Sequence, residues 1–81
     1  MTNREKRVAG VAERLRAARL ARGLTQDQLA DASGVGVATI RRIENRTTEP
    51  KIDTTARLAA ALGVDLKTLA FGDDDASEAG R

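Results

Sequence analysis

The fold is decided by residues 24–45, LTQDQLADASGVGVATIRRIEN, which contain two short helical patterns separated by a turn. Thr25 and Gln28 have the spacing of a capping box. In this motif the hydroxyl of the first residue accepts from the backbone amide three residues on, and the side chain of that later residue accepts from the backbone amide of the first. The sequence therefore predicts a helix that Thr25 caps and that runs to about Ala32.

The turn at residues 33–35 leads into a second helix that starts at Gly36. In this helix Ile40 and Ile43 face inward, three residues apart. Outward positions are Ala38, Arg41, Arg42 and Asn45. Because the turn is too short for antiparallel packing, the two helices must cross steeply, as in a DNA-binding helix-turn-helix. The glycines follow a helix rather than a strand, so we predict no phosphate-bearing cofactor here.

The segment before this stretch also has a helical pattern, with apolar residues at spacings of three and four. These residues are Val8, Val11, Leu15 and Ala18. The helix begins either at Asn3, behind a capping box that starts at Thr2, or near Gly10 with an arm before it. Gly23 is expected to end it.

Two more helices are expected after the stretch, and no segment alternates with the period of a strand. One covers about residues 53–62, with Gly63 as its stop, and the other is capped by Asp65. The last helix holds Leu66, Leu69 and Phe71, which form either a dimer surface or the contact with the first helix. The fold class is therefore all-α.

Composition limits the function. The chain has 81 residues with neither Cys nor His, so thiolate metal sites, disulfides and the commonest general base are excluded. We therefore expect no enzyme, no metal and no cofactor. No apolar run is long enough to cross a bilayer and the N-terminus is no signal peptide, which predicts a cytoplasmic protein. Residues 1–71 carry 13 basic and 8 acidic side chains, whereas residues 72–81 carry a net charge of −3, and such a basic body favours nucleic acid.

Residues 24–30, 33–35 and 39–45 together resemble the Cro and phage-repressor family, also called the XRE family. The resemblance extends outward over about residues 13–70. It implies a compact five-helix bundle of the lambda-repressor-like type, with helices two and three as the helix-turn-helix. The domain is then expected at residues 13–71, between an extension of helix one or basic arm at 1–12 and a disordered acidic tail at 72–81.

The resemblance also implies roles for single residues. Positions that contact base edges are Val37, Ala38, Arg41 and Arg42. Expected phosphate contacts are Arg16, Gln26, Thr39, Asn45, Arg46 and Lys51. Arg19 and Glu44 occupy positions that often form a partly buried pair between helices one and three, so we assign both to structure.

The chain departs from the family pattern at several positions. Gly36 replaces a small hydroxyl residue and offers no side-chain cap. Val37 and Ala38 neither donate nor accept a hydrogen bond, so base discrimination is expected to depend on the arginines. Arg46 replaces a common glycine, which predicts an altered turn, and Thr55 replaces a core leucine, which predicts looser packing.

These features predict a sequence-specific DNA-binding transcriptional regulator, a repressor that binds a palindromic operator as a homodimer. The two copies pair either in solution or only on DNA. The alternative is an antitoxin-like interaction protein of the same fold that also binds a partner protein. In either case double-stranded DNA is the expected ligand, and no membrane is involved.

Overall fold

A computed structural model describes residues 3–72, with side chains placed from residue 10 onward. Over this range the chain is all-α and has no strand, as predicted. Its helices are α1 (Asn3–Ala21), α2 (Gln26–Ser33), α3 (Val37–Glu44), α4 (Ile52–Leu62) and α5 (Leu66–Phe71). The capping box at Thr2, the side chain of Val8 and the acidic tail beyond Gly72 lie outside the described residues. None of the described helices is long and apolar enough to span a membrane.

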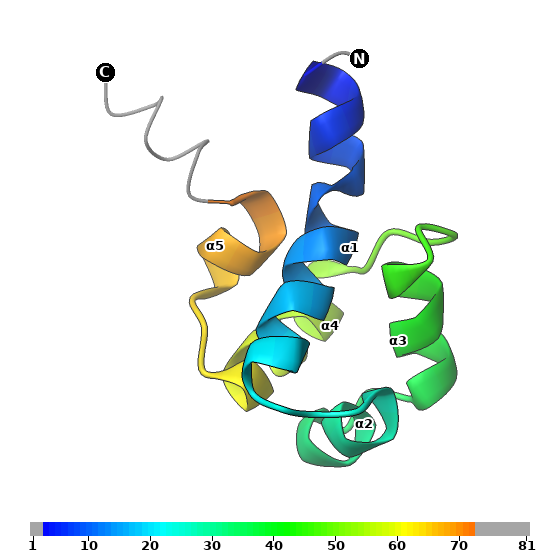
Figure 1. Cartoon of the computed structure of the whole chain (residues 1–81), viewed down its shortest axis with the longest axis vertical. Helices are drawn as coiled ribbons and strands as arrows, with labels where there is room; N and C mark the ends of the chain where they lie inside the picture. Colours follow the sequence, from blue (N-terminus) through cyan, green and yellow to red (C-terminus); the bar gives the residue numbers. More distant parts are fainter. Residues whose placement is uncertain (1–2, 73–81) are drawn as a thin grey trace.

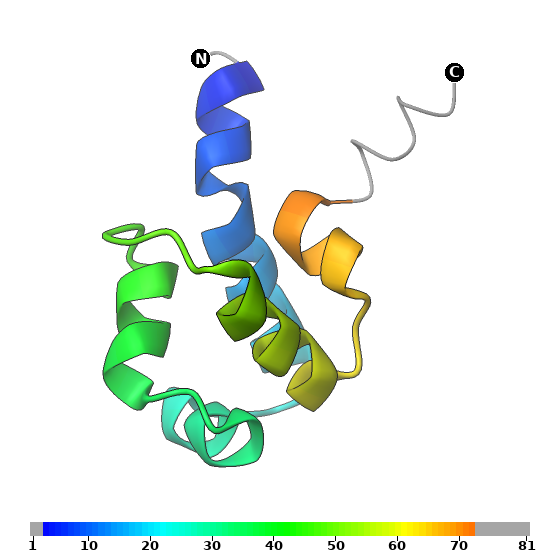
Figure 2. The same cartoon turned by 180° about the vertical axis from the view of Figure 1, so that it is seen from behind.

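The helices form one bundle around α1 (Figure 1). α1 packs against α3 on one side and α5 on the other, and α2 packs against both α3 and α4. Seen from behind, α4 lies between α3 and α5 (Figure 2). In Figure 1 α2 is viewed along its axis whereas α3 runs up the page, so the two helices cross steeply. The bundle therefore carries α3 along one side, supported by α1 and α2.

Local chemistry sets the helix ends. The Thr25 hydroxyl accepts from the Gln28 amide at 3.0 Å, and the Gln28 side chain accepts from the Thr25 amide at 2.9 Å, which is a complete capping box. α2 ends at Gly34, whose φ of 77° lies in the left-handed region that glycine adopts without strain. Asp65 accepts from the Thr68 amide and caps α5. The caps at Thr25 and Gly34 therefore fix both ends of α2, and Asp65 fixes the start of α5.

The core consists mainly of branched aliphatic side chains, and every helix contributes at least one of its members. Its members include Leu15, Leu29, Ile40, Ile43, Leu58, Ala59, Leu62 and Leu69. The inward positions predicted for α3, Ile40 and Ile43, are confirmed. Val35, predicted only as part of the turn, is also buried and attaches the turn to the core. Each such side chain contributes about 1.5–3 kcal/mol to stability, so this short chain depends on every one.

Thr55 of α4 and Phe71 of α5, both singled out in the sequence, differ in burial. Thr55, at the position of a usual leucine, is buried, and its hydroxyl donates to the Lys51 carbonyl at 3.0 Å. Its polar group is therefore satisfied inside α4. In α5 Leu69 enters the core and Leu66 packs against it, whereas the side chain of Phe71 remains 59% exposed. The contact between α5 and α1 thus leaves most of the aromatic side chain exposed.

Arginines of α1 and of the turn after it hold the ends of two later helices, which the sequence did not reveal. Arg14 donates from Nε to the Leu69 carbonyl at 2.9 Å and from Nη2 to the Ala70 carbonyl at 2.8 Å. Arg22 donates from Nη1 to the Leu62 carbonyl at 3.1 Å. A cation at a helix C-terminus satisfies carbonyls without an intrahelical partner and opposes the helix dipole. These contacts dock α4 and α5 on α1.

Replacing Arg14 tests this docking. We expect Arg14→Ala to lower the free energy of unfolding by about 1–3 kcal/mol, because two carbonyls of α5 lose a charged donor. Urea unfolding followed by circular dichroism measures the loss. Arg57→Ala, which removes an exposed arginine from α4, is the control and should leave the midpoint unchanged. Equal midpoints for the two variants would contradict the assigned role of Arg14.

Candidate nucleic-acid interface

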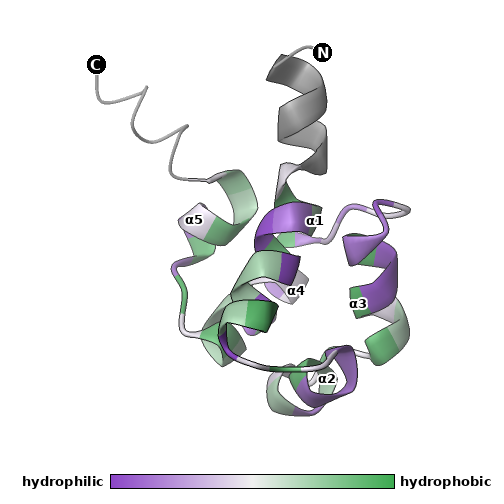
Figure 3. Ribbon diagram, viewed as in Figure 1, coloured by the Kyte–Doolittle hydropathy of each residue, from purple (hydrophilic) through white to green (hydrophobic). Residues whose placement is uncertain are grey.

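α3 has one buried face and one exposed face. Ile40 and Ile43 are essentially inaccessible to solvent, whereas Ala38, Arg41 and Arg42 are exposed. Figure 3 shows a hydrophobic first turn of α3 followed by hydrophilic residues. Because the buried isoleucines fix the rotation of the helix, the two arginines must point away from the bundle. The exposed face thus presents two guanidinium groups and a methyl group together.

The turn before α3 adjoins two acidic residues of α2. Gly36 precedes the helix and makes no side-chain cap, as expected from the sequence. A groove beside this turn is lined by α2 and the turn itself, and its lining includes the carboxylates of Asp27 and Asp31. Two carboxylates close to a helix N-terminus disfavour a bound anion there. Val37, the first residue of α3, is half-buried.

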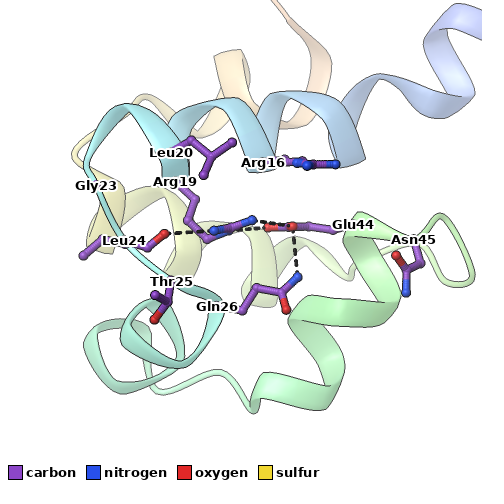
Figure 4. Close-up of a pocket in the computed structure, with 9 residues that line it drawn as sticks. All are labelled: Arg16, Arg19, Leu20, Gly23, Leu24, Thr25, Gln26, Glu44 and Asn45. Atoms are coloured by element: carbon purple, nitrogen blue, oxygen red, sulfur yellow. Dashed lines mark hydrogen bonds and ion pairs between the residues drawn. The ribbon is translucent and has the colours of Figure 1, made fainter.

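An ion pair joins α1 to the last residue of α3 (Figure 4). Arg19 donates from Nε to Glu44 Oε2 at 2.8 Å and from Nη2 to Glu44 Oε1 at 2.9 Å. Its third nitrogen, Nη1, donates to the Leu24 carbonyl at 2.8 Å. The side chains of Arg19 and Glu44 are only 9% and 5% exposed. This two-bond geometry fixes the orientation of both side chains inside the bundle.

α2 joins the same network through Gln26, whose Nε2 donates to Glu44 Oε1 at 3.1 Å. Burial by itself raises the pKa of Glu44, but the hydrogen bonds from Arg19 and Gln26 and the charges of Arg19 and Arg16 outweigh it. The net result is a Glu44 pKa below the ordinary value. The pKa of Arg19 is raised, chiefly by its hydrogen bond to Glu44. Both partners therefore remain charged at neutral pH.

An open groove of about 670 Å³ lies over this network. Three of the residues expected to contact phosphate line it together: Arg16 from α1, Gln26 from α2 and Asn45 after α3. Arg19 and Glu44 also line the groove and neutralise each other there (Figure 4). The structure thus brings together predicted contacts from three segments. Thr39, half-buried, and Lys51, exposed before α4, are not among the residues that line this groove.

Arg46 occupies an unusual backbone position. The sequence predicted an altered turn where Arg46 replaces glycine, but its φ of 64° is the left-handed conformation that glycine ordinarily provides. The Thr47 amide donates to the Arg42 carbonyl and the Arg46 amide to the Ile43 carbonyl, which is a Schellman motif. Among the described residues Arg46 is the only non-glycine with positive φ. A side chain in this conformation costs about 1–2 kcal/mol.

The side chain of Arg46 makes an ion pair that the sequence did not indicate. Its Nη2 lies 2.6 Å from Oε2 of Glu13 on α1. Both side chains are exposed, Arg46 by 53% and Glu13 by 66%. The partners are 33 residues apart, so no local spacing rule could have paired them. Like Gln26, which donates to Glu44, Arg46 is thus an expected phosphate contact that already has a carboxylate partner.

The chain is similar to known helix-turn-helix proteins. The family model described as Helix-turn-helix (HTH_3) matches residues 15–69. The chain is also similar to a crystal structure of an HTH_3 family transcriptional regulator from Vibrio cholerae, with 27% sequence identity and a TM-score of 0.78. The similarity covers 93% of this chain but 42% of that one, so the present chain spans less than half the length of this relative. No curated protein matches the chain.

The Arg19–Glu44 pair predicts a specific pH dependence of stability. Because the pKa of Glu44 is lowered in the folded state, its contribution is present above the unfolded pKa, about 4.3, and is lost as pH falls through the folded pKa. We expect Glu44→Ala to lose about 3 kcal/mol at pH 7, since it leaves the buried Arg19 charge unpaired. The difference in the free energy of unfolding between wild type and Glu44→Ala should become smaller in acid.

Urea unfolding at a series of pH values from neutral down to about 3 measures this difference. Glu49→Ala, which removes an exposed carboxylate from the loop after α3, is the control. Its free energy of unfolding should equal that of wild type at every pH. If Glu44→Ala unfolds like wild type but no longer binds DNA, Glu44 contacts DNA and the structural assignment is wrong.

Proposed function

Because the chain belongs to the helix-turn-helix family HTH_3, we propose that it is a sequence-specific DNA-binding transcriptional regulator. The observation that carries the proposal is the two-faced α3, with Ile40 and Ile43 buried and Arg41 and Arg42 exposed. The resemblance to the XRE family, predicted from the sequence, is confirmed by the family match. The similar structure from Vibrio cholerae is described as a transcriptional regulator, which supports the same role here.

Base recognition is proposed for the exposed face of α3. An arginine can donate two hydrogen bonds to O6 and N7 of guanine in the major groove, and a methyl group can contact the thymine methyl. Arg41 and Arg42 can donate the hydrogen bonds to guanine, and Val37 and Ala38 can supply methyl groups for thymine. Since Val37 is half-buried, Ala38 has more of its surface available. Sequence discrimination should therefore depend mainly on the two arginines.

Phosphate contacts are proposed for the groove that faces the end of α3. Arg16, Gln26 and Asn45 line one open surface, so one stretch of DNA backbone could meet donors from three segments. Such contacts fix the position of the protein on the duplex and add affinity without sequence information. Further contacts are proposed for Thr39 within α3 and for Arg46 and Lys51 in the segment between α3 and α4. Thr25 acts indirectly, since its cap fixes the first turn of α2 that carries Gln26.

A homodimer on a palindromic operator is proposed from the size of the reading surface. One eight-residue helix contacts few base pairs, whereas two copies on half-sites about one helical turn apart multiply the specificity. The copies pair in solution or on the DNA itself. Bound at a promoter, such a dimer would obstruct transcription, and we propose that it acts as a repressor.

Selection of bound sequences from a random duplex pool tests this function. We expect a palindromic consensus, and Arg42→Ala should weaken binding to it by about 1–3 kcal/mol while relaxing one base position in each half-site. Fluorescence anisotropy on the consensus and on single-base variants measures both effects. Arg57→Ala on the exposed side of α4 is the matched control. Absence of any enriched sequence at low salt, with folded protein, would contradict the proposal.

A further inference from the structure

Glu13 and Arg46 connect α1 to the loop after α3, and Figures 1 and 2 both show this loop beside α1. We propose that Glu13 is a positioning residue, which holds the Arg46 guanidinium so that its remaining donors meet a DNA phosphate. The inference rests on the proposed DNA-binding function and deepens it. It assigns a role in DNA binding to an acidic side chain that itself touches no DNA.

The fold does not need an arginine at position 46. The left-handed conformation at φ 64° suits glycine better than any residue with a Cβ. The ion pair with Glu13 offsets little of this strain, because both side chains are more than half exposed and exposed pairs contribute little to stability. The backbone bonds of the Schellman motif would form equally well with glycine. The side chain of Arg46 is therefore better explained by a task outside the fold.

The geometry of the pair leaves Arg46 able to bind a second anion. Only Nη2 is engaged, by one carboxylate oxygen of Glu13 at 2.6 Å. A guanidinium has five N–H donors in a planar fork, and among the described side chains, from residue 10 onward, no other group accepts from this one. Its free edge matches the two oxygens of a phosphate. Glu13 thus limits the rotamers of a long side chain before DNA arrives, which lowers the entropy lost on binding.

The position of the pair fits the proposed path of the DNA backbone. Glu13 and Arg16 are three residues apart on α1, so they share one face of the helix. Arg16 lines the groove with Asn45, and Arg46 is the next residue along the chain. A phosphate at Arg46 would therefore adjoin the backbone held by Arg16 and Asn45. Glu13 would thus orient Arg46 as a further phosphate contact beside Arg16 and Asn45.

Four variants test the inference: Glu13→Ala, Glu13→Gln, Arg46→Gly and the double variant of Glu13→Ala with Arg46→Gly. The probe is a labelled mixed-sequence duplex of about 24 base pairs, two helical turns or slightly more. A mixed sequence suffices because phosphate contacts are independent of sequence. Affinity is measured by anisotropy between about 50 and 200 mM KCl, and folding is checked by thermal unfolding.

Arg46→Gly should raise the unfolding temperature, because glycine adopts positive φ without strain. It should nevertheless weaken DNA binding about three- to tenfold and reduce the salt slope by about 0.9, the loss of one phosphate contact. Glu13→Ala should weaken binding about threefold in the wild-type background and have no such effect beside Arg46→Gly. Glu13→Gln retains an acceptor for Arg46 and should bind at least as tightly as wild type.

Two results would overturn the positioning role. Tighter binding by Glu13→Ala would show that Glu13 competes with phosphate for Arg46. Equal weakening by Glu13→Ala in both backgrounds would show that Glu13 acts independently of Arg46. Glu49→Ala controls for the general loss of a negative charge near the same loop. If the wild-type protein fails to bind the duplex even at low salt, the proposed function itself fails, and the role of Glu13 fails with it.

Discussion

The ion pair between Arg19 and Glu44 is the interaction on which the arrangement of the first three helices depends. Two nitrogens of Arg19 donate to the Glu44 carboxylate, and the third donates to the Leu24 carbonyl just before α2. Gln26 of α2 donates to the same Glu44 carboxylate. The last residue of α3 is thereby fixed against α1 and α2 at once. Packing of Ile40 and Ile43 sets how α3 is rotated, and the pair sets where its far end lies.

The arginines of this chain divide into two groups that net charge cannot separate. Arg14 and Arg19 of α1, and Arg22 just after it, are held by carbonyls or by a carboxylate of the fold. Arg41 and Arg42 of α3 are exposed on the proposed reading face. A count of basic residues therefore overstates the charge that the protein can offer to DNA. The charges of Arg14, Arg19 and Arg22 stabilise the bundle instead, whereas Arg46 pairs with Glu13 and is still proposed to bind a phosphate.

Features governed by neighbours in the chain could be predicted from the sequence. The capping box of Thr25 and Gln28 and the inward pair Ile40 and Ile43 follow from spacing, and both are present. Contacts between distant segments could not be predicted, because an arginine that caps a remote helix has the same helical spacing as a solvated one. Arg14 meets carbonyls 55 and 56 residues away. The resemblance to a family supplied the partner of Arg19, which spacing alone would not have done.

The central claim is that DNA lies along α3 and the groove at its end, and amide chemical shifts measured during a titration with duplex test it directly. On the operator duplex, the account predicts that the largest changes lie in residues 37–46 and at Gln26, with α5 nearly unaffected. Changes concentrated on α4 and α5, with the amides of α3 unmoved, would contradict it.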